Sequence, residues 1–261
     1  MPEQLPQRPE PLLRAESAAS GYGASLVVRG ISITAGRGEI VTVVGPNGSG
    51  KSTLLKTLAG LVPVRSGRIW HGADDVTGLP AEARARGGIA YLPQEREVFA
   101  SLTVRENLLM GGYPLGRREL KVALERVHAS YPLLGRLERA MAGRLSGGER
   151  KTVAMARLMM TSPSVVLLDE PTASLAPIPS AQLLEQDVPA LAAAGAAVVL
   201  VEQRAAAAMA VSGWVYVLVG GAVELTGPAA EIAARHDLGA VFLGAGSGDA
   251  GSRDAGRGEQ A

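Results

Sequence analysis

Cysteine is absent from the 261-residue sequence, which excludes a disulfide-stapled scaffold and any metal site that needs thiolate ligands. Charge of one sign is not in excess either, because the formal net charge is only +1. No global field therefore points to nucleic acid or to an acidic partner. With 47% hydrophobic and 20% charged residues, the composition is typical of a globular protein with a substantial core. From the balanced charge we expect a protein that binds no nucleic acid.

A long uninterrupted apolar run is also missing. The longest stretch, from about 188 to 201, contains Pro189 and Gly195 and is shorter than the ~20 residues that a membrane-spanning helix needs. The first residues, MPEQLPQRPEPLLRAE, lack the apolar segment of a secretory signal. We therefore expect a chain that does not itself span a membrane, although it can act on one through a partner.

Short apolar runs alternate with helical patterns along the middle of the chain. GEIVTVVG (38–45), SVVLLDE (164–170) and AAVVLVEQ (196–203) are typical of strands buried on both faces, and a helical segment follows each of them. This alternation predicts an α/β fold with a mostly parallel sheet. About residues 101–160, successive helical patterns occur without a strand, which predicts an inserted helical subdomain.

Two other segments indicate antiparallel structure. SLVVRGISIT (25–34) alternates like an antiparallel strand pair near the N-terminus. WVYVLVGGAVELTG (214–227) predicts a hairpin that turns at Gly220 and Gly221.

Both ends of the chain have the composition of unstructured segments. Residues 1–11 are rich in Pro, Gln and Glu, and residues 245–261 are rich in Gly, Ser and charge. We expect two disordered tails around one domain, residues 12–244.

The segment GPNGSGKST has the Gly-x-x-x-x-Gly-Lys-Ser spacing of a phosphate-binding loop and lies between a predicted strand and a predicted helix. Its glycines let backbone N–H groups point at phosphate oxygens, and the helix N-terminus adds partial positive charge there. The predicted nucleotide-binding residues are Gly45, Pro46, Asn47, Gly48, Ser49, Gly50, Lys51, Ser52 and Thr53. In this site Lys51 would bridge the β- and γ-phosphates, Ser52 would ligate Mg²⁺ and Thr53 would add a phosphate contact. The alternative is a glycine-rich turn with an exposed lysine.

Asp169 and Glu170 end the second apolar run. At the carboxyl edge of a parallel sheet, where ligands bind, Asp169 can hold Mg²⁺ through water and Glu170 can act as general base on an attacking water. The alternative is a pair of solvated acids that open a helix.

LSGGE (145–149) offers a second phosphate-binding surface. Ser146, Gly147 and Gly148 would present a hydroxyl and several backbone N–H groups at a helix N-terminus. The alternative is an ordinary helix start in which Ser146 and Glu149 form a capping box.

In this order, GPNGSGKST, LSGGE and VVLLDEPT resemble the nucleotide-binding subunit of ATP-binding cassette (ABC) transporters, over about residues 13–243. The resemblance implies a P-loop NTPase sheet with an inserted helical subdomain and an N-terminal antiparallel β subdomain. It also implies a head-to-tail dimer that holds two ATP molecules with Mg²⁺, each between one phosphate loop and the LSGGE of the other subunit. In the family pattern Tyr22 matches the adenine-stacking aromatic, and Gln94 matches the glutamine that senses Mg²⁺ and the transport partner.

A narrower resemblance, to the F-type ATPase of branched-chain amino acid importers, rests on VFASLTVRENL, LAPI, LVEQ and FLGAG. It implies transmembrane permease subunits, a periplasmic substrate-binding protein as an indirect partner, and a peripheral place on the cytoplasmic side of a bacterial inner membrane. Urea and amide importers share these traits, and motif chemistry does not separate an exporter ATPase. A DNA-repair ATPase of the same superfamily would carry long coiled coils or zinc modules, for which the sequence has neither heptads nor cysteines.

Three positions depart from the general cassette pattern. Gln203 stands where a switch histidine is usual; as a catalytic residue it could donate a similar hydrogen bond but could not titrate. Ala176 replaces an aspartate that contacts the opposite phosphate loop, so we expect a different ATPase subunit as partner and unequal sites, with a homodimer as the alternative. Arg150 and Lys151 are more basic than the subgroup pattern, and a solvated face is favoured over contact with the nucleotide of the partner. Phe99 fits either a permease contact or the core.

Overall fold

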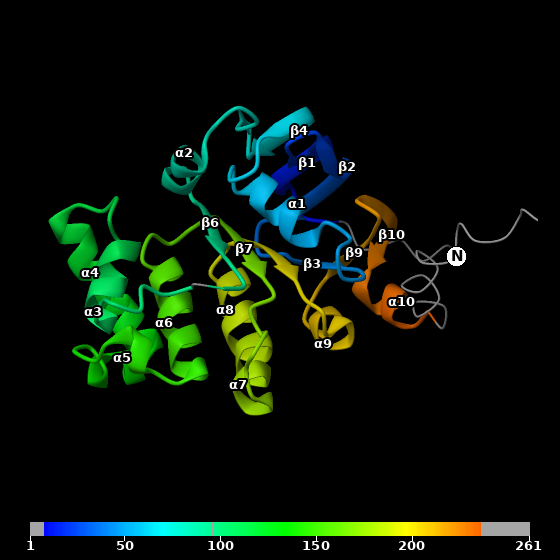
Figure 1. The fold of residues 1–261 in the computed structure, drawn as a ribbon. Coiled ribbons are helices and arrows are strands. Elements are labelled where there is room, and N and C mark those ends of the chain that lie inside the picture. Colours follow the sequence, from blue (N-terminus) through cyan, green and yellow to red (C-terminus); the bar gives the residue numbers. More distant parts are fainter. Residues whose placement is uncertain (1–7, 96, 236–261) are drawn as a thin grey trace, which may run out of the picture.

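The computed structural model describes residues 8–95 and 97–235, in which two sheets and a separate group of helices are arranged around the central strands (Figure 1). The strands are β1 (Pro11–Tyr22), β2 (Ser25–Gly36), β3 (Ile40–Val44), β4 (Val64–His71), β5 (Asp74–Asp75), β6 (Ile89–Leu92), β7 (Val165–Asp169), β8 (Ala197–Val201), β9 (Trp214–Val219) and β10 (Ala222–Pro228). The helices are α1 (Lys51–Leu58), α2 (Ala81–Arg86), α3 (Val104–Gly111), α4 (Arg117–Ser130), α5 (Pro132–Arg136), α6 (Gly147–Met159), α7 (Pro177–Gln182), α8 (Val188–Ala193), α9 (Ala205–Ala210) and α10 (Ala229–Ala233), with a 3₁₀ turn at Ala142–Arg144 and a π-helix at Leu183–Asp187.

The larger sheet has the strand order β10-β9-β3-β8-β7-β6 and is parallel except for β10 at its edge. Every residue of β3, β7 and β8 is buried, as their continuous apolar runs predict. One face packs against α1 and the smaller sheet, and the other packs against α6, α8 and the π-helix. The predicted α/β fold with a mostly parallel sheet is confirmed.

The smaller sheet is antiparallel, with the order β2-β1-β4-β5. Residues 25–34 do not form a strand pair, so this expectation is wrong. They belong to the single strand β2, which pairs with β1 from the turn at Gly23 and Ala24 onward. One face of β2 is buried and the other exposed, and such a strand shows the same alternation of apolar residues as a hairpin would. The second predicted hairpin, β9 to β10, does turn at Gly220 and Gly221.

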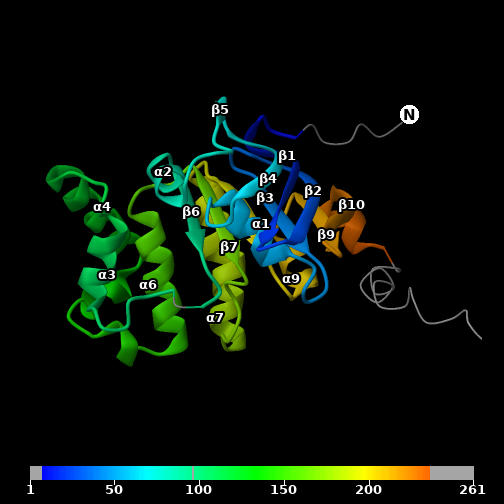
Figure 2. The ribbon, with the colours of Figure 1, turned by 45° about the horizontal axis from the view of Figure 1, so that its top comes forward.

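Residues 101–160 contain α3, α4, α5 and α6, which lie together beyond the β6 edge of the large sheet (Figures 1 and 2). Their apolar faces form a separate core that includes Leu108, Val127 and Val153. The start of α3 is fixed by a capping box between Thr103 and Glu106. This arrangement matches the predicted insertion of a helical subdomain.

The N-terminal side of the described chain begins inside the segment that we expected to be a tail. The Arg8 guanidinium donates to both carboxylate oxygens of Glu39 at 2.8 and 3.0 Å and lies 4.6 Å from the centroid of the Trp214 ring. β1 then starts at Pro11. The expected C-terminal boundary at 244 and the tail 245–261 lie outside the described residues.

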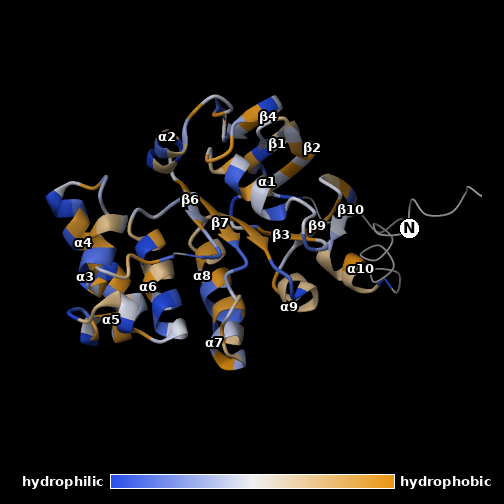
Figure 3. Ribbon diagram, in the orientation of Figure 1, coloured by the Kyte–Doolittle hydropathy of each residue, from blue (hydrophilic) through white to orange (hydrophobic). Residues whose placement is uncertain are grey.

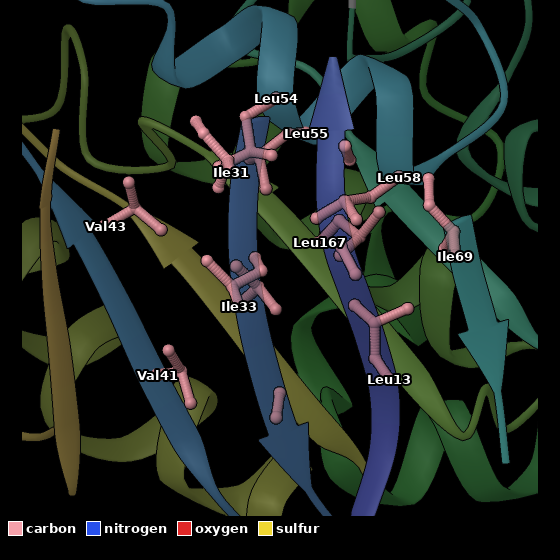
Figure 4. Close-up of a cluster of buried hydrophobic side chains, with 14 of the residues drawn as sticks. Leu13, Ile31, Ile33, Val41, Val43, Leu54, Leu55, Leu58, Ile69 and Leu167 are labelled. Carbon is pink, nitrogen blue, oxygen red and sulfur yellow. The ribbon is translucent and has the colours of Figure 1, made fainter. Parts of the chain in front are cut away.

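The main core joins the two sheets through α1. Leu54, Leu55 and Leu58 of this helix are fully buried between strands of both sheets, and Leu167 of β7 belongs to the same cluster (Figure 4). The central strands β3 and β7 of the large sheet are correspondingly apolar along most of their length (Figure 3). Burial of a leucine side chain contributes about 1.5–3 kcal/mol, so this cluster fixes α1 firmly against the end of β7.

Arg84 is a buried cation that holds the far end of α1. It is 2% exposed and donates to the carbonyl oxygens of Thr57 and Leu58, both at 2.8 Å, and to those of Leu79 and Thr77 at 3.0 and 2.9 Å. The carbonyls at a helix C-terminus have no partner inside the helix, and a cation there also offsets the negative end of the helix dipole. Arg84 thus serves as a C-terminal cap for the helix that follows the phosphate loop.

In the part of the chain that the structure describes, none of the helices combines the length and the apolar character needed to cross a membrane.

Candidate nucleotide site

The loop GPNGSGKST connects β3 to α1, and Gly50 is the N-cap of that helix with φ of 99°, a left-handed conformation that glycine adopts without strain. Lys51 is 5% exposed, and its Nζ donates to the carbonyl oxygens of Gly45 and Pro46 at 2.8 and 2.9 Å. The alternative of an exposed lysine on a glycine-rich turn is therefore wrong. Burial lowers the pKa of Lys51, while the nearby Glu170 and Asp169 act in the opposite direction.

Ser49 supports the interpretation of this loop as a phosphate site. Its Oγ is buried and has no hydrogen-bond partner among the described residues. Leaving a buried hydroxyl without a partner costs about 1–3 kcal/mol, and a phosphate oxygen would satisfy it. The carbonyl of the same residue accepts a hydrogen bond from the N–H of Gly221 at 3.1 Å, so the β9–β10 turn holds the loop from behind.

Asp169, at the end of β7, is 2% exposed and receives one hydrogen bond on each carboxylate oxygen. Ser52 Oγ donates to Oδ1 at 2.9 Å, and Tyr91 OH donates to Oδ2 at 3.0 Å. Burial, followed by the charge of Asp169, raises the pKa of Tyr91, so the phenol keeps its proton. The structure thus brings together Ser52 and Asp169, two of the three residues predicted to hold Mg²⁺ together with Gln94, and adds Tyr91, which sequence reasoning missed.

Glu170 is also buried, at 7% exposure, and has φ of 46°, which is uncommon for a residue with a side chain. Its Oε2 accepts hydrogen bonds from Gln94 Nε2 at 2.8 Å and from Gln203 Nε2 at 3.0 Å. Its backbone N–H donates to Val201 O at 2.9 Å. Two residues predicted from separate motifs therefore converge on the predicted base, and the alternative of two solvated acids is wrong for both Asp169 and Glu170.

Glu202, next to Gln203, is a second residue that sequence reasoning missed. It is 2% exposed, and its Oε1 accepts the N–H of Thr172 at 2.9 Å, which fixes the turn after Glu170. Burial raises the pKa of Glu202, and the charge of Glu170 adds to this effect. The only hint in the sequence is an acid that ends an otherwise apolar strand.

The LSGGE motif forms the start of α6. Ser146 is exposed, its Oγ accepts the N–H of Glu149 at 3.3 Å, and the Glu149 carboxylate accepts the N–H of Ser146 at 2.8 Å. The capping box is thus present, and the N-terminal N–H groups of a 13-residue helix remain beside it. α6 lies with α3, α4 and α5 and apart from α1 (Figures 1 and 2), so Ser146, Gly147 and Gly148 are not brought to the phosphate loop of their own chain.

Four other expected positions have clear outcomes. Tyr22 ends β1 with 52% of its surface exposed, so its ring is open to a stacking partner. Phe99 is 46% exposed, with the Arg157 guanidinium 5.0 Å from its ring centroid, so the core alternative is wrong. Lys151 is 3% exposed and pairs with Glu97, so the expected solvated face is wrong at this position. It lies on the side of α6 that also buries Met155 and Leu158, and this side carries the lysine toward the segment after β6. Ala176 is the N-cap of α7 and makes no side-chain cap.

The donors at this site are an alcohol, a carboxylate and a carboxamide, from Ser52, Asp169 and Gln94. Hard oxygen donors of this kind, few in number, suit Mg²⁺, which normally keeps several waters and binds through one or two carboxylates together with substrate phosphates. The residues present therefore fit Mg²⁺ with a nucleotide.

Gly221 offers a test of how the loop is supported. A Cβ at Gly221 would lie 2.0 Å from Val27 O, so Gly221→Ala must move the turn and the N–H that it donates to Ser49. Gly220→Ala is the matched control, because Gly220 also has positive φ but a Cβ there meets nothing within 4 Å. We expect Gly221→Ala to bind ATP about 10-fold more weakly than Gly220→Ala, measured by calorimetry. Equal affinities would show that the turn does not support the phosphate loop.

Comparison with known proteins agrees with this geometry. The family model described as ABC transporter matches residues 28–173, more than half of the chain. The high-affinity branched-chain amino acid transport ATP-binding protein BraG of Pseudomonas aeruginosa is 37% identical over 89% of this chain and 95% of its own. The probable branched-chain amino acid transport ATP-binding protein LivF of Archaeoglobus fulgidus is 38% identical over 85% and 94%. The lipopolysaccharide export system ATP-binding protein LptB of Escherichia coli is 35% identical over 89% and 97%.

Solved structures give the same result. The ADP conformation of MJ1267, an ATP-binding cassette of an ABC transporter, matches with a TM-score of 0.80 at 26% identity and covers 90% of this chain and 99% of its own. The phosphate loop, the capped LSGGE helix and the buried acid pair lie in one cassette fold, and the residues matched by the family model contain all three. The chain therefore belongs to the ABC transporter family, as an ATPase.

Proposed function

We propose that this chain is the ATP-hydrolysing subunit of a branched-chain amino acid importer. The observation that carries the proposal is the convergence of Gln94 and Gln203 on Glu170, beside Lys51 and the Ser52–Asp169 contact, at one edge of the parallel sheet. The similarity to BraG and LivF over most of the chain supports the transported class. Because LptB is 35% identical, an exporter ATPase is the second candidate, and a urea or amide importer is a variant of the first.

In this proposal ATP is the substrate, and its phosphates bind in the loop from Gly45 to Thr53, with Lys51 on the β- and γ-phosphates and Tyr22 against the adenine. Mg²⁺, held by Ser52, Asp169 and Gln94, would neutralise charge on the transferred phosphate. Glu170 takes a proton from the attacking water, and the two amides that bond its Oε2 aim the carboxylate. Gln203 orients without titrating, so catalysis does not depend on an imidazole at this position.

The second half of each ATP site comes from another subunit. Ser146, Gly147 and Gly148 lie on α6, away from the phosphate loop of their own chain, which supports a head-to-tail dimer in which they complete the site of the partner. The N-terminal N–H groups of α6 are suited to an anion. Ala176 offers no carboxylate toward the opposite loop, which favours a different ATPase subunit as partner and two unequal sites.

Apolar side chains next to the helical subdomain support a permease contact. Phe99, Met110 and Tyr113 are 46%, 48% and 77% exposed, and the last two border a groove of about 280 Å³ between the sheet edge and α6. Exposed apolar residues around a groove are typical of a surface that binds a partner helix. The chain would then work peripherally, on the cytoplasmic side of a bacterial inner membrane, and the periplasmic substrate-binding protein would act on it only through the permease.

The test is reconstitution of the full chain with its permeases, a second ATPase subunit and a binding protein in liposomes. ATP turnover should be slow for the chain alone, and it should rise with the partner subunit and rise again with leucine-loaded binding protein. Full activity of the chain as a homodimer would contradict the unequal sites. Stimulation by urea or an amide, or by none of the three ligands, would contradict the branched-chain amino acid assignment.

A further inference from the structure

We propose that Tyr91 is a positioning residue for the metal-binding carboxylate: its phenol fixes the orientation of Asp169 so that the other carboxylate oxygen stays with Ser52. The inference rests on the proposed function, because it assigns Asp169 to Mg²⁺. It adds a residue that none of the nucleotide motifs contains. Tyr91 acts through Asp169 and touches no reacting atom.

The sheet register explains how a residue outside the motifs reaches the site. β6 pairs with β7 in parallel, and Tyr91 lies opposite Leu167. Side chains two positions apart share a face of a strand, so Asp169 lies on the same face as Leu167, one step diagonally from Tyr91. A tyrosine is long enough to span such a diagonal, and its OH is 3.0 Å from Asp169 Oδ2. α1, which carries Ser52, covers this same face.

The two hydrogen bonds hold the carboxylate at both oxygens. Rotation of a carboxylate about its last torsion has no strongly preferred staggered position, so a single donor leaves its plane poorly fixed. Ser52 binds Oδ1 at 2.9 Å, and Tyr91 binds Oδ2 at 3.0 Å. A neutral phenol fixes the plane without neutralising the charge that a cation needs. An ammonium or guanidinium at position 91 would compete with the metal instead.

The same strand also leads to the second acid. Gln94 follows β6 by two residues and donates to Glu170 Oε2 at 2.8 Å. Asp169 and Glu170 are therefore both held from β6 and the loop after it, one by a phenol and the other by an amide. Partners of this kind, which orient a ligand without binding the metal, typically change metal affinity by about 10–100-fold when they are removed.

The competing explanation is that Tyr91 only fills space. Its ring packs against the cluster between α1 and the sheets, which includes Leu54 and Leu167. Tyr91→Phe separates the two explanations, because it keeps the ring and removes only the donor to Asp169. Tyr131→Phe is the matched control, since Tyr131 is another partly buried phenol that donates to a carboxylate, at 3.3 Å to Asp187, remote from the nucleotide loop.

The main measurement is the affinity of the full chain for Mn²⁺ in the presence of ADP, by electron paramagnetic resonance, together with ADP affinity in EDTA. We expect Tyr91→Phe to bind Mn²⁺ about 10-fold more weakly, with unchanged ADP affinity in EDTA, and Tyr131→Phe to match the wild type in both. The Mg²⁺ concentration for half-maximal ATP turnover should rise in parallel, with little change in the KM for ATP at saturating Mg²⁺.

Two tyrosine analogues of similar size at position 91 provide a rescue variant and a second variant without the donor, so the test does not depend on the folding of Tyr91→Phe alone. 4-Aminophenylalanine at position 91 retains a donor and should restore Mn²⁺ affinity, whereas 4-fluorophenylalanine has none and should not. Wild-type Mn²⁺ affinity in Tyr91→Phe and in the fluoro variant would overturn the proposal. So would an equal loss of ADP affinity in EDTA, because Tyr91 would then contact the nucleotide. If the wild type itself binds no Mn²⁺ with ADP, the proposed function fails instead.

Discussion

Glu170→Gln is expected to lower kcat for ATP hydrolysis by a factor of about 10²–10⁴ while ATP still binds with nearly wild-type affinity. Glu170 is buried, and the two hydrogen bonds to its carboxylate come from the side-chain amides of Gln94 and Gln203, which leaves the carboxylate free to accept a proton from water. A glutamine fills the same space, but it cannot accept that proton at neutral pH. The loss should therefore fall on the chemical step, which single-turnover phosphate release measures directly.

Glu185→Gln is the control for removal of an acid. Glu185 is exposed on the π-helix after the site, and its substitution should leave both kcat and ATP affinity unchanged. Wild-type kcat in Glu170→Gln would contradict the assignment of Glu170 as the base. A loss of ATP binding that accounts for the whole loss of turnover would also contradict it.

Arg84→Ala is expected to lower the free energy of unfolding by about 2–4 kcal/mol. The substitution leaves four carbonyl oxygens without the donors that the guanidinium now provides, two of them at the C-terminus of α1. These groups are shielded from solvent by the same packing that buries Arg84 to 2% exposure, so water replaces the lost donors poorly. Urea unfolding followed by circular dichroism gives the change in free energy.

Two residues further along the chain, Arg86 provides the matched control. It lies on the same helix, but its side chain is 62% exposed and pairs with the exposed Glu82, so Arg86→Ala should change the free energy of unfolding by less than about 0.5 kcal/mol. Arg84→Lys should recover only part of the loss, because an ammonium cannot reproduce the planar fork of donors. Equal destabilisation by the Arg84 and Arg86 variants would contradict the capping role.

The parts that could be predicted from the sequence depend on local patterns. Continuous apolar runs indicate strands buried on both faces, and β3, β7 and β8 are such strands. The spacing of the glycines and Lys51 specifies the conformation of the phosphate loop. The burial of Lys51, whose Nζ donates to a carbonyl of the same loop, therefore follows from the local sequence. The pairing of SLVVRGISIT did not follow, because alternation reports which face of a strand is buried and not which strand is its neighbour.

The contacts that sequence reasoning missed all depend on which distant elements become neighbours. Tyr91 reaches Asp169 only through the register of β6 on β7, and no motif spacing contains this information. Lys151 looks solvated in the basic run after LSGGE, yet it is buried because α6 turns it toward Glu97. Glu202 follows β8 and accepts the N–H of Thr172, which lies in the turn after β7, so its contact depends on these two strands being neighbours.

The segment after β6 connects the candidate nucleotide site with the surface proposed for the permease. Gln94, which bonds Glu170, and Phe99, which is exposed beside α3, lie in the same short segment after β6. Asn107 of α3 is fully buried and holds the backbone N–H and carbonyl of Phe99 at 2.8 and 3.0 Å. A displacement of α3 by a bound partner would therefore move a backbone segment that leads directly to the base.

Phosphate release from Mg²⁺–ATP by the purified full chain, compared with its Lys51→Ala variant, tests the central claim most directly. Lys51 is the buried cation of the phosphate loop, so the account predicts measurable, slow turnover for the wild type and a loss of about 10²-fold or more in the variant, with the fold retained by circular dichroism. Turnover at the same rate in both proteins, or no ATP binding by the wild type, would contradict the claim that this loop and the acids beside it form an ATP-hydrolysing site.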